Sequence, residues 1–381
     1  MPLKGIKVLE FAGLAPAPFC GMILAEFGAS VIKIDKTSSH GTVDSLGHGK
    51  RSIAINLKTQ EGSDIVKKLS KHSDVVIEPF RPGVMERMKL GPEDLMKINE
   101  KLIYARLTGF GQSGPYANMA GHDINYLGLS GLLSLFGRHS QKPTPPVNLA
   151  ADFGGGGLMC AFGIILALFE RSKSNCGQVI DTSMVEGSAY LGSWLFRSQN
   201  MPLLWGKPRG ENVLDSGTHF YDTYETKDKQ YMCVGALEPQ FYEELLEKLG
   251  IPFDEMPQFE NFEKNRKELE QIFKQKTRAE WCEIFDGTNA CVTPVLSLKD
   301  VALHTHNKKR DTFITKNSDV VIPNPTPRLS RTPGMSKGNQ RNPDPGEHTI
   351  EILTELNLKH QEISNLIATG IVSQAMKHSM L

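Results

Sequence analysis

Short apolar runs alternate with amphipathic stretches through the first half of the chain, and this alternation restricts the fold more than any other feature. Runs typical of β-strands occupy residues 7–11, 30–35, 52–57, 74–78 and 102–108. Strands that alternate with helices favour parallel pairing, with the helices packed on the faces of the sheet. The sequence therefore predicts an α/β fold whose large, Rossmann-like domain is built on a mostly parallel sheet.

The pattern changes after about residue 200. Two strand-like runs joined by a polar turn, at 219–226 and 231–235, indicate an antiparallel hairpin, and helical segments follow. After about residue 310 the chain is rich in Pro and Asn, which is typical of an extended connector, and it closes with two helix-like stretches. We therefore expect a large α/β domain at 1–200, a smaller α+β domain at 201–310, and a connector with C-terminal helices at 311–381.

Composition excludes several classes of protein. The 43 Lys+Arg residues balance 43 Asp+Glu, so the chain lacks the broad positive charge by which proteins attract nucleic acids. The six cysteines are widely spaced without a C-x-x-C pair, which argues against a disulfide framework or a zinc site. The longest apolar run, residues 158–169, is shorter than the ~20 residues that a transmembrane helix needs. The sequence predicts a folded protein with no nucleic-acid partner, no metal site and no membrane span.

The turn after the first predicted strand tests for a dinucleotide-binding fold. That fold needs the pattern G-x-G-x-x-G so that the backbone can approach a pyrophosphate, whereas here Gly13 is followed by Leu-Ala-Pro-Ala-Pro. Asp35 ends the next predicted strand, but Lys33 and Lys36 flank it and suit a phosphate better than a ribose hydroxyl. NAD is therefore disfavoured as a cofactor.

Basic residues recur near the ends of the predicted strands. They are Lys36, Arg51, Lys58, Arg81 and Arg87. In a parallel sheet several of them would converge at one edge and form a local anion site, which a protein of zero net charge can still hold. Solvated surface charge is the alternative, and spacing alone favours that alternative.

Two short motifs could carry acid/base chemistry. His122 and Asp123 open an apolar helix, and the N–H groups at a helix N-terminus can hold an oxyanion. Asp152 precedes four glycines at 154–157, which would let a ligand or a neighbouring backbone come close to a carboxylate. Taken one at a time, these residues and Glu238 are better explained as helix caps or helix-start acids. Together they supply a base, carboxylates and an anion site.

Seven motifs in chain order resemble one known family. They are Phe80-Arg-Pro-Gly-Val-Met-Glu-Arg87, Gly109-Phe-Gly-Gln-Ser-Gly-Pro115, Gly121-His-Asp-Ile-Asn-Tyr126, Asp152-Phe-Gly-Gly-Gly-Gly157, Arg209-Gly-Glu-Asn-Val-Leu-Asp-Ser-Gly217, Gly235-Ala-Leu-Glu-Pro-Gln-Phe241 and Ala290-Cys-Val-Thr-Pro-Val295. The family is the α-methylacyl-CoA racemases, of the family III CoA-transferase/racemase group, and the resemblance extends over residues 3–310. It is weaker at 37–49 and after residue 310, and Lys36 replaces the usual arginine, which keeps the charge but loses the planar fork.

The resemblance implies a fold, an activity and a set of site residues. It implies an interlocked homodimer whose large domain is made from both ends of the chain. His122 and Asp152 would be the acid/base pair, and Glu238 of the other subunit would support the histidine. The residues implied in CoA binding are Lys36, Ile55, Asn56, Leu57, Lys58, Arg81 or Arg87, and Gly121, Asp123, Ile124, Asn125 and Tyr126.

The implied reaction interconverts (2R)- and (2S)-2-methylacyl-CoA thioesters by α-proton abstraction and reprotonation through an enolate, in branched-chain fatty acid and bile acid metabolism. Such a reaction needs a base on one face and an acid on the other, with donors for the enolate oxygen, among them the Asp123 backbone N–H. No metal or redox cofactor is required, and CoA is part of the substrate.

Two other functions stay open at this point. A family III CoA-transferase would use Asp152 as a nucleophile on the thioester, although such transferases generally lack the histidine of the Gly-His-Asp motif. A non-catalytic acyl-CoA-binding protein would need the anion site but no acid/base pair. The family resemblance favours the racemase over both.

The last three residues, Ser379-Met380-Leu381, nearly match the Ser-Lys-Leu address that peroxisomal import receptors read. Racemases of this family work in peroxisomes and sometimes in mitochondria. We therefore expect a peroxisomal location, with a mitochondrial share.

Overall fold

The computed structural model describes residues 1–39, 44–316 and 320–375, so the C-terminal tripeptide 379–381 lies outside the described residues. The chain forms two compact units. Unit 1 comprises residues 1–130, 146–191 and 309–381, and unit 2 comprises residues 131–145 and 192–308. Unit 1 thus takes in both ends of the chain.

A seven-stranded sheet forms the centre of unit 1, with strand order β12-β3-β2-β1-β4-β5-β6. Its strands are β1 (Lys7–Phe11), β2 (Ser30–Asp35), β3 (Arg51–Ile55), β4 (Val75–Glu78), β5 (Ile103–Thr108), β6 (Val179–Ser183) and β12 (Val372–Ser373). All neighbours pair in parallel except β12, which is antiparallel to β3. The predicted α/β fold with a mostly parallel sheet is confirmed. The strand order reverses between β1 and β4, which is where such sheets place their ligands.

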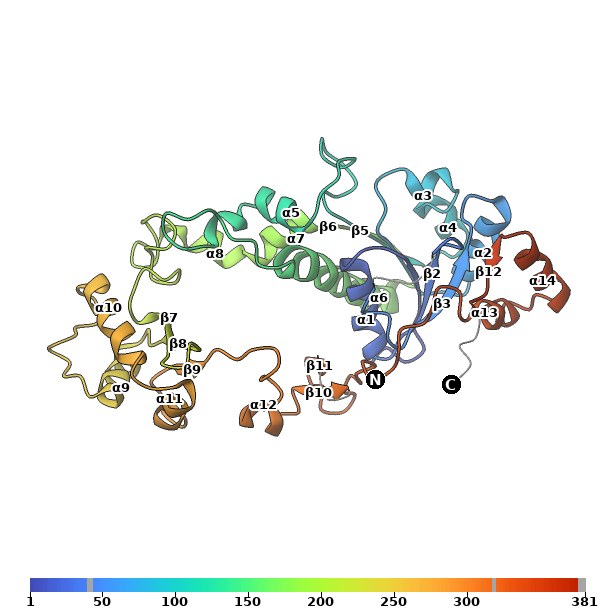
Figure 1. The fold of residues 1–381 in the computed structure, drawn as a ribbon. Helices are drawn as coiled ribbons and strands as arrows, with labels where there is room; N and C mark the ends of the chain where they lie inside the picture. Colours follow the sequence, from blue (N-terminus) through green and yellow to red (C-terminus); the bar gives the residue numbers. More distant parts are fainter. Residues whose placement is uncertain (40–43, 317–319, 376–381) are drawn as a thin grey trace. The chain divides into compact units, whose positions relative to one another are not determined.

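Helices cover both faces of this sheet, because alternate side chains of each strand point to opposite faces (Figure 1). Leu9 and Phe11 belong to an apolar core that includes Val66 of α2 and Leu353 of α13. The helices of that face are α2 (Gln60–Ser70), α3 (Val84–Arg87), α4 (Pro92–Ile98), α13 (Thr349–Glu355) and α14 (His360–Ala368). The other face packs on α1 (Pro16–Glu26) and α6 (Met159–Ser174).

The glycine run is helical, which the sequence analysis did not predict. Residues 149–158 form η2 (Leu149–Leu158), a π-helix that continues into α6. A Cβ atom on Gly187 of α7 (Met184–Leu191) would lie 1.8 Å from the Gly155 carbonyl oxygen, and one on Gly155 would lie 2.5 Å from Ser188 N. The absence of a side chain at Gly155 and Gly187 therefore lets the backbones of η2 and α7 pack closely together. The sequence analysis had expected the glycine run to admit either a ligand or a neighbouring backbone.

This continuous helical stretch, Leu149–Ser174, is 26 residues long, with a mean hydropathy of 1.7 in its most apolar window. By length and composition alone it could cross a membrane, whereas the sequence analysis considered only residues 158–169 and predicted no span. The same test is passed by core helices of globular proteins, and 44% of the window is buried. Within unit 1, η2 and α6 pack against β5, β6 and α1.

The Pro- and Asn-rich region after residue 310 was predicted to be an extended connector, but part of it forms regular structure. Strands β10 (Phe313–Lys316) and β11 (Val320–Pro323) form an antiparallel pair within it. The region then passes α1, where Met335 N donates to the Glu26 carbonyl oxygen, before it reaches α13. Short helix α12 (Thr305–Lys309) precedes it.

Unit 2 is an α+β unit built on a three-stranded antiparallel sheet. Its strands are β7 (Tyr221–Glu225), β8 (Tyr231–Gly235) and β9 (Val292–Pro294), and its main helices are α8 (Ser193–Arg197), α9 (Pro239–Leu249), α10 (Phe262–Phe273) and α11 (Arg278–Phe285). Aromatic side chains such as Tyr224, Phe273 and Trp281 fill its core. His219 is fully buried there beside Tyr242, and burial lowers the pKa of its imidazole to about 4.

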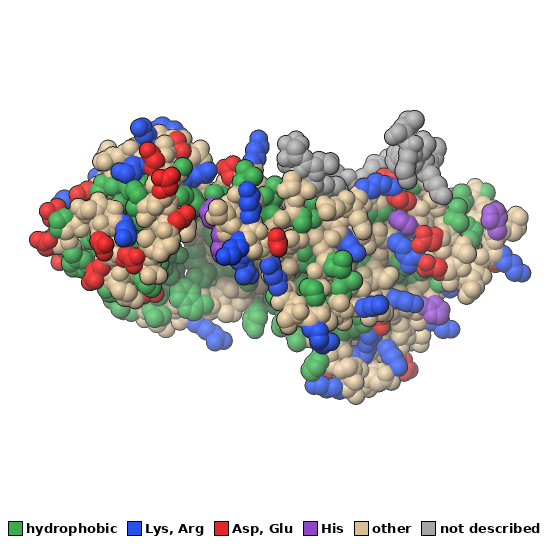
Figure 2. All heavy atoms as spheres, turned by 90° about the horizontal axis from the view of Figure 1, so that it is seen from below, with side chains coloured by type: hydrophobic (Ala, Val, Ile, Leu, Met, Phe, Trp, Pro, Cys, Tyr) green, Lys and Arg blue, Asp and Glu red, His purple; other side chains and the backbone are tan. Residues whose placement is uncertain are grey.

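Figure 2 shows one face of the molecule with its side chains coloured by type. On that face Asp and Glu side chains gather toward the left of the view, whereas Lys and Arg side chains are more frequent in its centre and on its right.

Candidate active site

A cavity of about 680 Å³ in unit 1 lies outside the carboxyl ends of β1, β4 and β5. Segments 13–16 and 79–81, which follow β1 and β4, line it together with segment 107–110, which includes the end of β5. Parts of α5 (Asp123–Leu129) and η2 also line it. The cavity therefore straddles the place where the strand order reverses, because β1 and β4 are neighbours there.

His122 lines this cavity at the N-terminal end of α5. It is the residue immediately before the helix, and its backbone N–H donates to Asn125 Oδ1 at 3.0 Å. Among the described residues no hydrogen bond or ion pair to the imidazole ring is found, and the residue is exposed. The start of α5 therefore fixes the backbone of His122, and its imidazole ring is open to the cavity.

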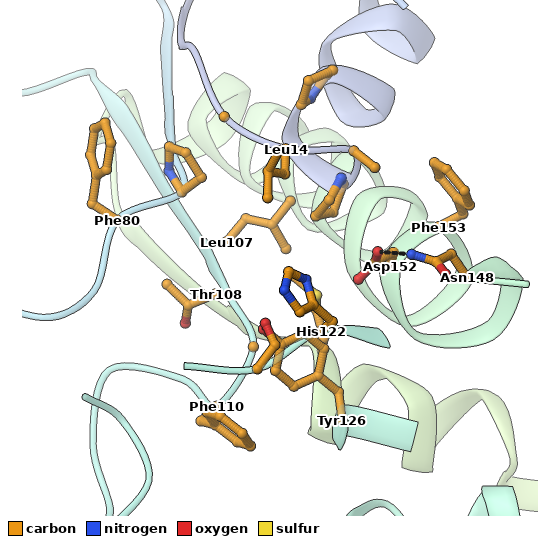
Figure 3. A pocket seen from close by; sticks show the side chains of 18 of the residues that line it. Leu14, Phe80, Leu107, Thr108, Phe110, His122, Tyr126, Asn148, Asp152 and Phe153 are labelled. Carbon is orange, nitrogen blue, oxygen red and sulfur yellow. Dashed lines mark hydrogen bonds between the residues drawn. The ribbon is translucent and has the colours of Figure 1, made fainter. Parts of the chain in front are cut away.

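Asp152 lines the same cavity from η2, and only 7% of the residue is exposed. Figure 3 shows its carboxylate and the His122 imidazole directed toward a common space. The Asn148 side-chain amide donates to Asp152 Oδ2 at 2.8 Å. Burial raises the pKa of Asp152 above the ordinary aspartate value, while the bond from Asn148 and the proximity of His122 oppose the rise.

Asp123 is the first residue of α5, but its carboxylate does not cap that helix. Its Oδ1 accepts hydrogen bonds from Ala151 N at 2.9 Å and Asp152 N at 2.7 Å, so it caps η2 instead. The sequence analysis considered Asp123 as a helix cap, and it is one, but the helix that it caps is η2 and not α5.

Tyr126 of α5 closes one wall of the cavity. Its hydroxyl donates to the Gly121 carbonyl oxygen, and its ring meets the Phe110 ring edge to face at 5.1 Å between centroids. A Cβ atom on Gly109 would come within 2.1 Å of the Tyr126 ring, so this position needs a glycine. Ile124 and Asn125, also implied in CoA binding, are exposed on the first turn of the same helix.

The predicted cationic residues do not all converge. Arg81 lines the cavity after β4 and donates to the Asn118 carbonyl oxygen at 3.3 Å. Arg87 lies on α3 and is exposed outside the cavity lining. Arg51 begins β3 at the opposite, amino-terminal edge of the sheet, where its guanidinium pairs with Glu351 and Glu355 at 2.7 and 2.6 Å.

Two further predicted CoA-binding segments lie farther along the carboxyl edge of the sheet. Lys36 follows β2 and is exposed. Ile55 is buried at the end of β3, and residues 56–58 follow it, with Lys58 exposed. The Asn56 side chain accepts from the Lys58 backbone N–H at 3.2 Å. Neither segment lines the cavity itself, but both lie on the edge from which it opens.

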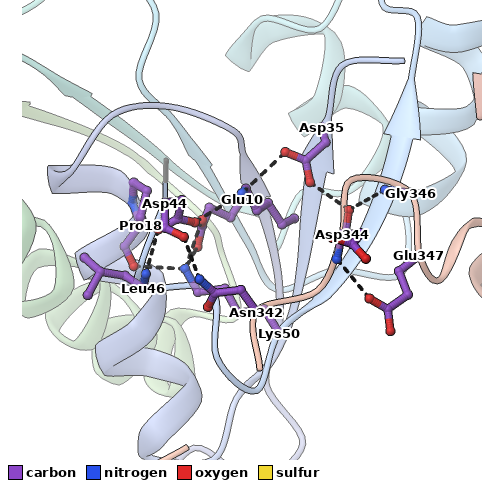
Figure 4. Close-up of polar contacts among 12 residues, drawn as sticks. Glu10, Pro18, Asp35, Asp44, Leu46, Lys50, Asn342, Asp344, Gly346 and Glu347 are labelled. Atoms are coloured by element: carbon purple, nitrogen blue, oxygen red, sulfur yellow. Dashed lines mark hydrogen bonds and ion pairs between the residues drawn. The ribbon is translucent and has the colours of Figure 1, made fainter. Parts of the chain in front are cut away.

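Lys33 is not available for a phosphate, contrary to the sequence analysis. It belongs to a buried polar cluster, defined here as Glu10, Lys33, Asp35, Asp44 and Lys50. Figure 4 labels the other four members. Lys33 Nζ lies 3.4 Å from Asp35 and 3.1 Å from Asp44, and Lys50 Nζ lies 2.8 Å from Glu10. Asp44 also lines the cavity, so the cluster anchors one of its walls.

Glu238 lies in unit 2, immediately before α9. Its backbone carbonyl accepts hydrogen bonds from Phe241 N and Tyr242 N, as expected at a helix start. Together with burial and Glu244, its charge raises the pKa of the Cys291 thiol. Its support of the histidine across a dimer stays a prediction.

Two polar residues of the site were missed by the sequence analysis. Asn148 has φ 64° and lies four residues before Asp152, so the i,i+4 spacing on a helix could have indicated their contact. Thr108 ends β5, lines the cavity, and is one of the buried side chains in the described part of the chain whose hydroxyl has no partner. No local pattern distinguishes that threonine.

Comparisons with known proteins agree with this geometry. The chain is 52% identical to the alpha-methylacyl-CoA racemase of Mus musculus, over 98% of both chains, and 52% identical to that of Homo sapiens, over 100% of both. It is 30% identical to the succinyl-CoA–L-malate CoA-transferase beta subunit of Chloroflexus aurantiacus, over 98% of both. A solved CAIB/BAIF family protein from Brucella suis is 28% identical and superposes with a TM-score of 0.78, over 93% of this chain and 99% of that one.

The family model for CoA-transferase family III matches residues 3–349, which include every strand of the sheet except β12 and all residues of the cavity. A parallel sheet with a cavity at its switch point, the Gly-His-Asp start of α5 and the glycine-rich η2 are thus features of one continuous match. The chain belongs to CoA-transferase family III.

Proposed function

We propose that this protein is a racemase that interconverts the (2R) and (2S) epimers of 2-methyl-branched acyl-CoA thioesters. The relatives that match it from end to end at 52% identity are alpha-methylacyl-CoA racemases. One observation carries the proposal: His122, immediately before α5, and Asp152 of η2 reach the same cavity from two different segments of the chain.

The proposed chemistry is a proton transfer between two faces of one carbon. A proton α to a thioester is weakly acidic, so its removal needs a base nearby and donors for the enolate oxygen. His122 and Asp152 exchange the roles of base and acid according to the hand of the substrate. Burial raises the pKa of Asp152, which brings this carboxyl closer to neutral pH and favours proton exchange there.

The cavity walls suit a varied acyl chain. Leu14, Leu107, Phe153 and Met184 line it, and apolar walls hold hydrocarbon without fixing its shape. We propose that CoA lies along the carboxyl edge of the sheet, with Arg81 at the mouth of the cavity and Lys36 and Lys58 farther along. Such remote contacts contribute binding energy to orient the reacting carbon.

The test is incubation of the purified protein with (2R)-2-methylacyl-CoA in deuterated water. We expect deuterium at the α-carbon together with the (2S) epimer, and loss of the (2S) epimer in His122→Ala. A non-catalytic binding protein would show no deuterium exchange either as wild type or as His122→Ala, and both would bind CoA with the same affinity.

The CoA-transferase is the second candidate, because a relative at 30% identity over 98% of both chains is one. In that reaction Asp152 would attack the thioester carbonyl and release CoA as the leaving group. Absence of exchange, together with transfer of CoA to an added free carboxylate, would favour this candidate. The open imidazole of His122 beside Asp152 favours the racemase, since the transferase step does not need it.

We also propose that the protein acts as a homodimer. Leu158, Phe162, Leu166 and Phe169 recur on one face of the helical stretch formed by η2 and α6, and they are 48, 51, 52 and 62% exposed. A second copy covering this stripe would remove it from water. Light scattering should give twice the chain mass, and Phe162→Glu with Phe169→Glu should lower it, whereas Ile350→Glu on α13 should not. A monomeric wild type would contradict the proposal.

Peroxisomal location stays a prediction. It rests on Ser379-Met380-Leu381 and on the family resemblance. A fluorescent fusion that ends in this tripeptide should enter peroxisomes, and the same fusion without it should not. Equal import of both would contradict the prediction.

A further inference from the structure

The backbone that carries Asp152 is held by a side chain from another helix. Asp123 is 2% exposed, and its Oδ1 accepts from Ala151 N at 2.9 Å and from Asp152 N at 2.7 Å. Both N–H groups belong to the first turn of η2, where a helix offers no acceptor of its own. One carboxylate oxygen of α5 therefore fixes the start of η2.

The Asp152 side chain is held from its other side by Asn148. This residue precedes η2 with φ 64°, a conformation that Asn and Asp tolerate better than other side chains do. Its amide donates to Asp152 Oδ2 at 2.8 Å, which ties the carboxylate to the helix start (Figure 3).

We propose that Asp123 and Asn148 are positioning residues that fix Asp152 between them and act on its charge in opposite directions. This inference rests on the proposed function, because it assigns the two residues a part in proton transfer. Asp123 places a second carboxylate beside Asp152, whereas Asn148 donates a hydrogen bond to the ionised form. Accordingly, the charge of Asp123 raises the pKa of Asp152 and the bond from Asn148 lowers it, on top of the larger rise that burial causes.

The remaining ionisable groups near Asp152 come from α5 and the β4 turn. His122 lowers the pKa of Asp152, and the charges of Asp152 and Arg81 act in opposite senses on the pKa of Tyr126. In the described part of the chain, ionisable groups on α1, α6 and α7, which also pack against η2, do not add to the shift at Asp152. Asp123 and Asn148 are thus the neighbours whose substitution changes its protonation without removing His122.

Two shape-matched substitutions test the charge effects. Asp123→Asn keeps an oxygen that can accept both N–H bonds but removes the charge, so the pKa of Asp152 should fall. Asn148→Asp keeps the backbone conformation accessible, removes the donor and adds a charge, so the pKa should rise. The Asp152 carboxyl carbon, assigned by its loss in Asp152→Asn, reports the titration by ¹³C NMR without substrate. Asp64→Asn, on the exposed side of α2, is the matched control and should shift nothing.

A third variant tests the positioning. Asp123→Ala removes the acceptor for both N–H groups, so kcat should fall by at least about tenfold while KM changes by less than about threefold. Asp123→Asn should keep a kcat about tenfold above that of Asp123→Ala, because the acceptor is retained.

In the direction in which Asp152 is the base, the acidic limb of kcat/KM should move to lower pH in Asp123→Asn and to higher pH in Asn148→Asp. An unchanged NMR titration in both variants, or a folded Asp123→Ala with wild-type kcat, would overturn the inference. A wild type that exchanges no deuterium would contradict the proposed function instead, and the titration would still decide the roles of Asp123 and Asn148.

Discussion

The cavity and the buried polar cluster that shares Asp44 with it both contain acidic and basic side chains, but the two regions differ in how those side chains are paired. In the cluster, Lys50 pairs with Glu10 at 2.8 Å, and Lys33 pairs with Asp35 and Asp44. In the cavity, neither His122 nor Asp152 forms an ion pair with any of the described residues.

The difference teaches how to distinguish a structural charge from a reactive one. A buried ion pair satisfies its own charges and leaves nothing for a ligand to neutralise. The Asp152 carboxylate is buried beside the cavity and accepts a hydrogen bond from a neutral donor, the Asn148 amide, so it stays free to exchange a proton. Asp44 belongs to both regions, since it pairs with Lys33 and also lines the cavity.

The largest expected effect is at the cavity. His122→Ala and Asp152→Asn should each lower the racemisation rate by about 10²–10⁴-fold, because each removes one partner of the proton transfer. Epimer ratios followed by chiral chromatography measure the loss. Urea unfolding should show little change in stability, and an active variant would remove the distinction drawn between the two regions.

The next effect is at the cluster. Lys50→Met leaves the Glu10 carboxyl buried without its ammonium partner, which should lower the free energy of unfolding by about 3–5 kcal/mol. Urea unfolding measures this loss, and Glu10→Met combined with Lys50→Met should recover most of it. A single variant as stable as wild type would mean that the pair is not buried as described.

Unit 2 contains a third case, a buried ionisable side chain, His219, that stays neutral. Burial lowers the pKa of His219 from 6.5 to about 4. Between these values the unfolded chain takes up a proton that the folded one does not, so stability should fall by about 3 kcal/mol as the pH drops from 6.5 to 4.

Urea unfolding at several pH values, read by tryptophan fluorescence, measures this loss, because Trp194, Trp205 and Trp281 all lie in unit 2. His219→Phe should flatten the slope, whereas His306→Gln, at an exposed position of unit 2, should leave it unchanged. Equal slopes in His219→Phe and wild type would contradict the assignment.

The smallest effect concerns substrate binding. Arg81→Ala should raise KM for acyl-CoA by about tenfold, since a charged hydrogen bond to a ligand is worth about 1.5 kcal/mol. Arg87→Ala should change KM much less, because Arg87 lies outside the cavity lining. The opposite ranking would place CoA over α3 instead.

The parts of the fold that were predicted well are those with a clear local period. Strands 7–11 and 30–35 have the bounds that the sequence indicated, because each is a short apolar run. The two-residue strand β12 and helix η2 were missed. Two residues carry no period, and a glycine run reads as a loop until the backbones that pack against it are known.

In the candidate site, too, some residues could be predicted from the sequence and others could not. The motifs and the family resemblance directed attention to His122 and Asp152, and the structure shows that they line one cavity. The two N–H groups that donate to the Asp123 carboxylate, those of Ala151 and Asp152, lie 28 and 29 residues farther along the chain on another helix. No rule of local spacing predicts a contact at that separation. Lys33 was misjudged for the same reason, because the sequence around a lysine in a strand does not show whether the side chain faces solvent or Asp44.

The central claim is that His122 and Asp152 act on opposite faces of the same carbon. The most direct measurement starts from each pure epimer in deuterated water, with wild type, His122→Ala and Asp152→Asn, and follows deuterium at the α-carbon by mass spectrometry. The account predicts that each variant loses racemisation and retains exchange from one epimer only, with the two variants retaining opposite epimers. Retention of the same epimer by both variants, or racemisation by either, would contradict it.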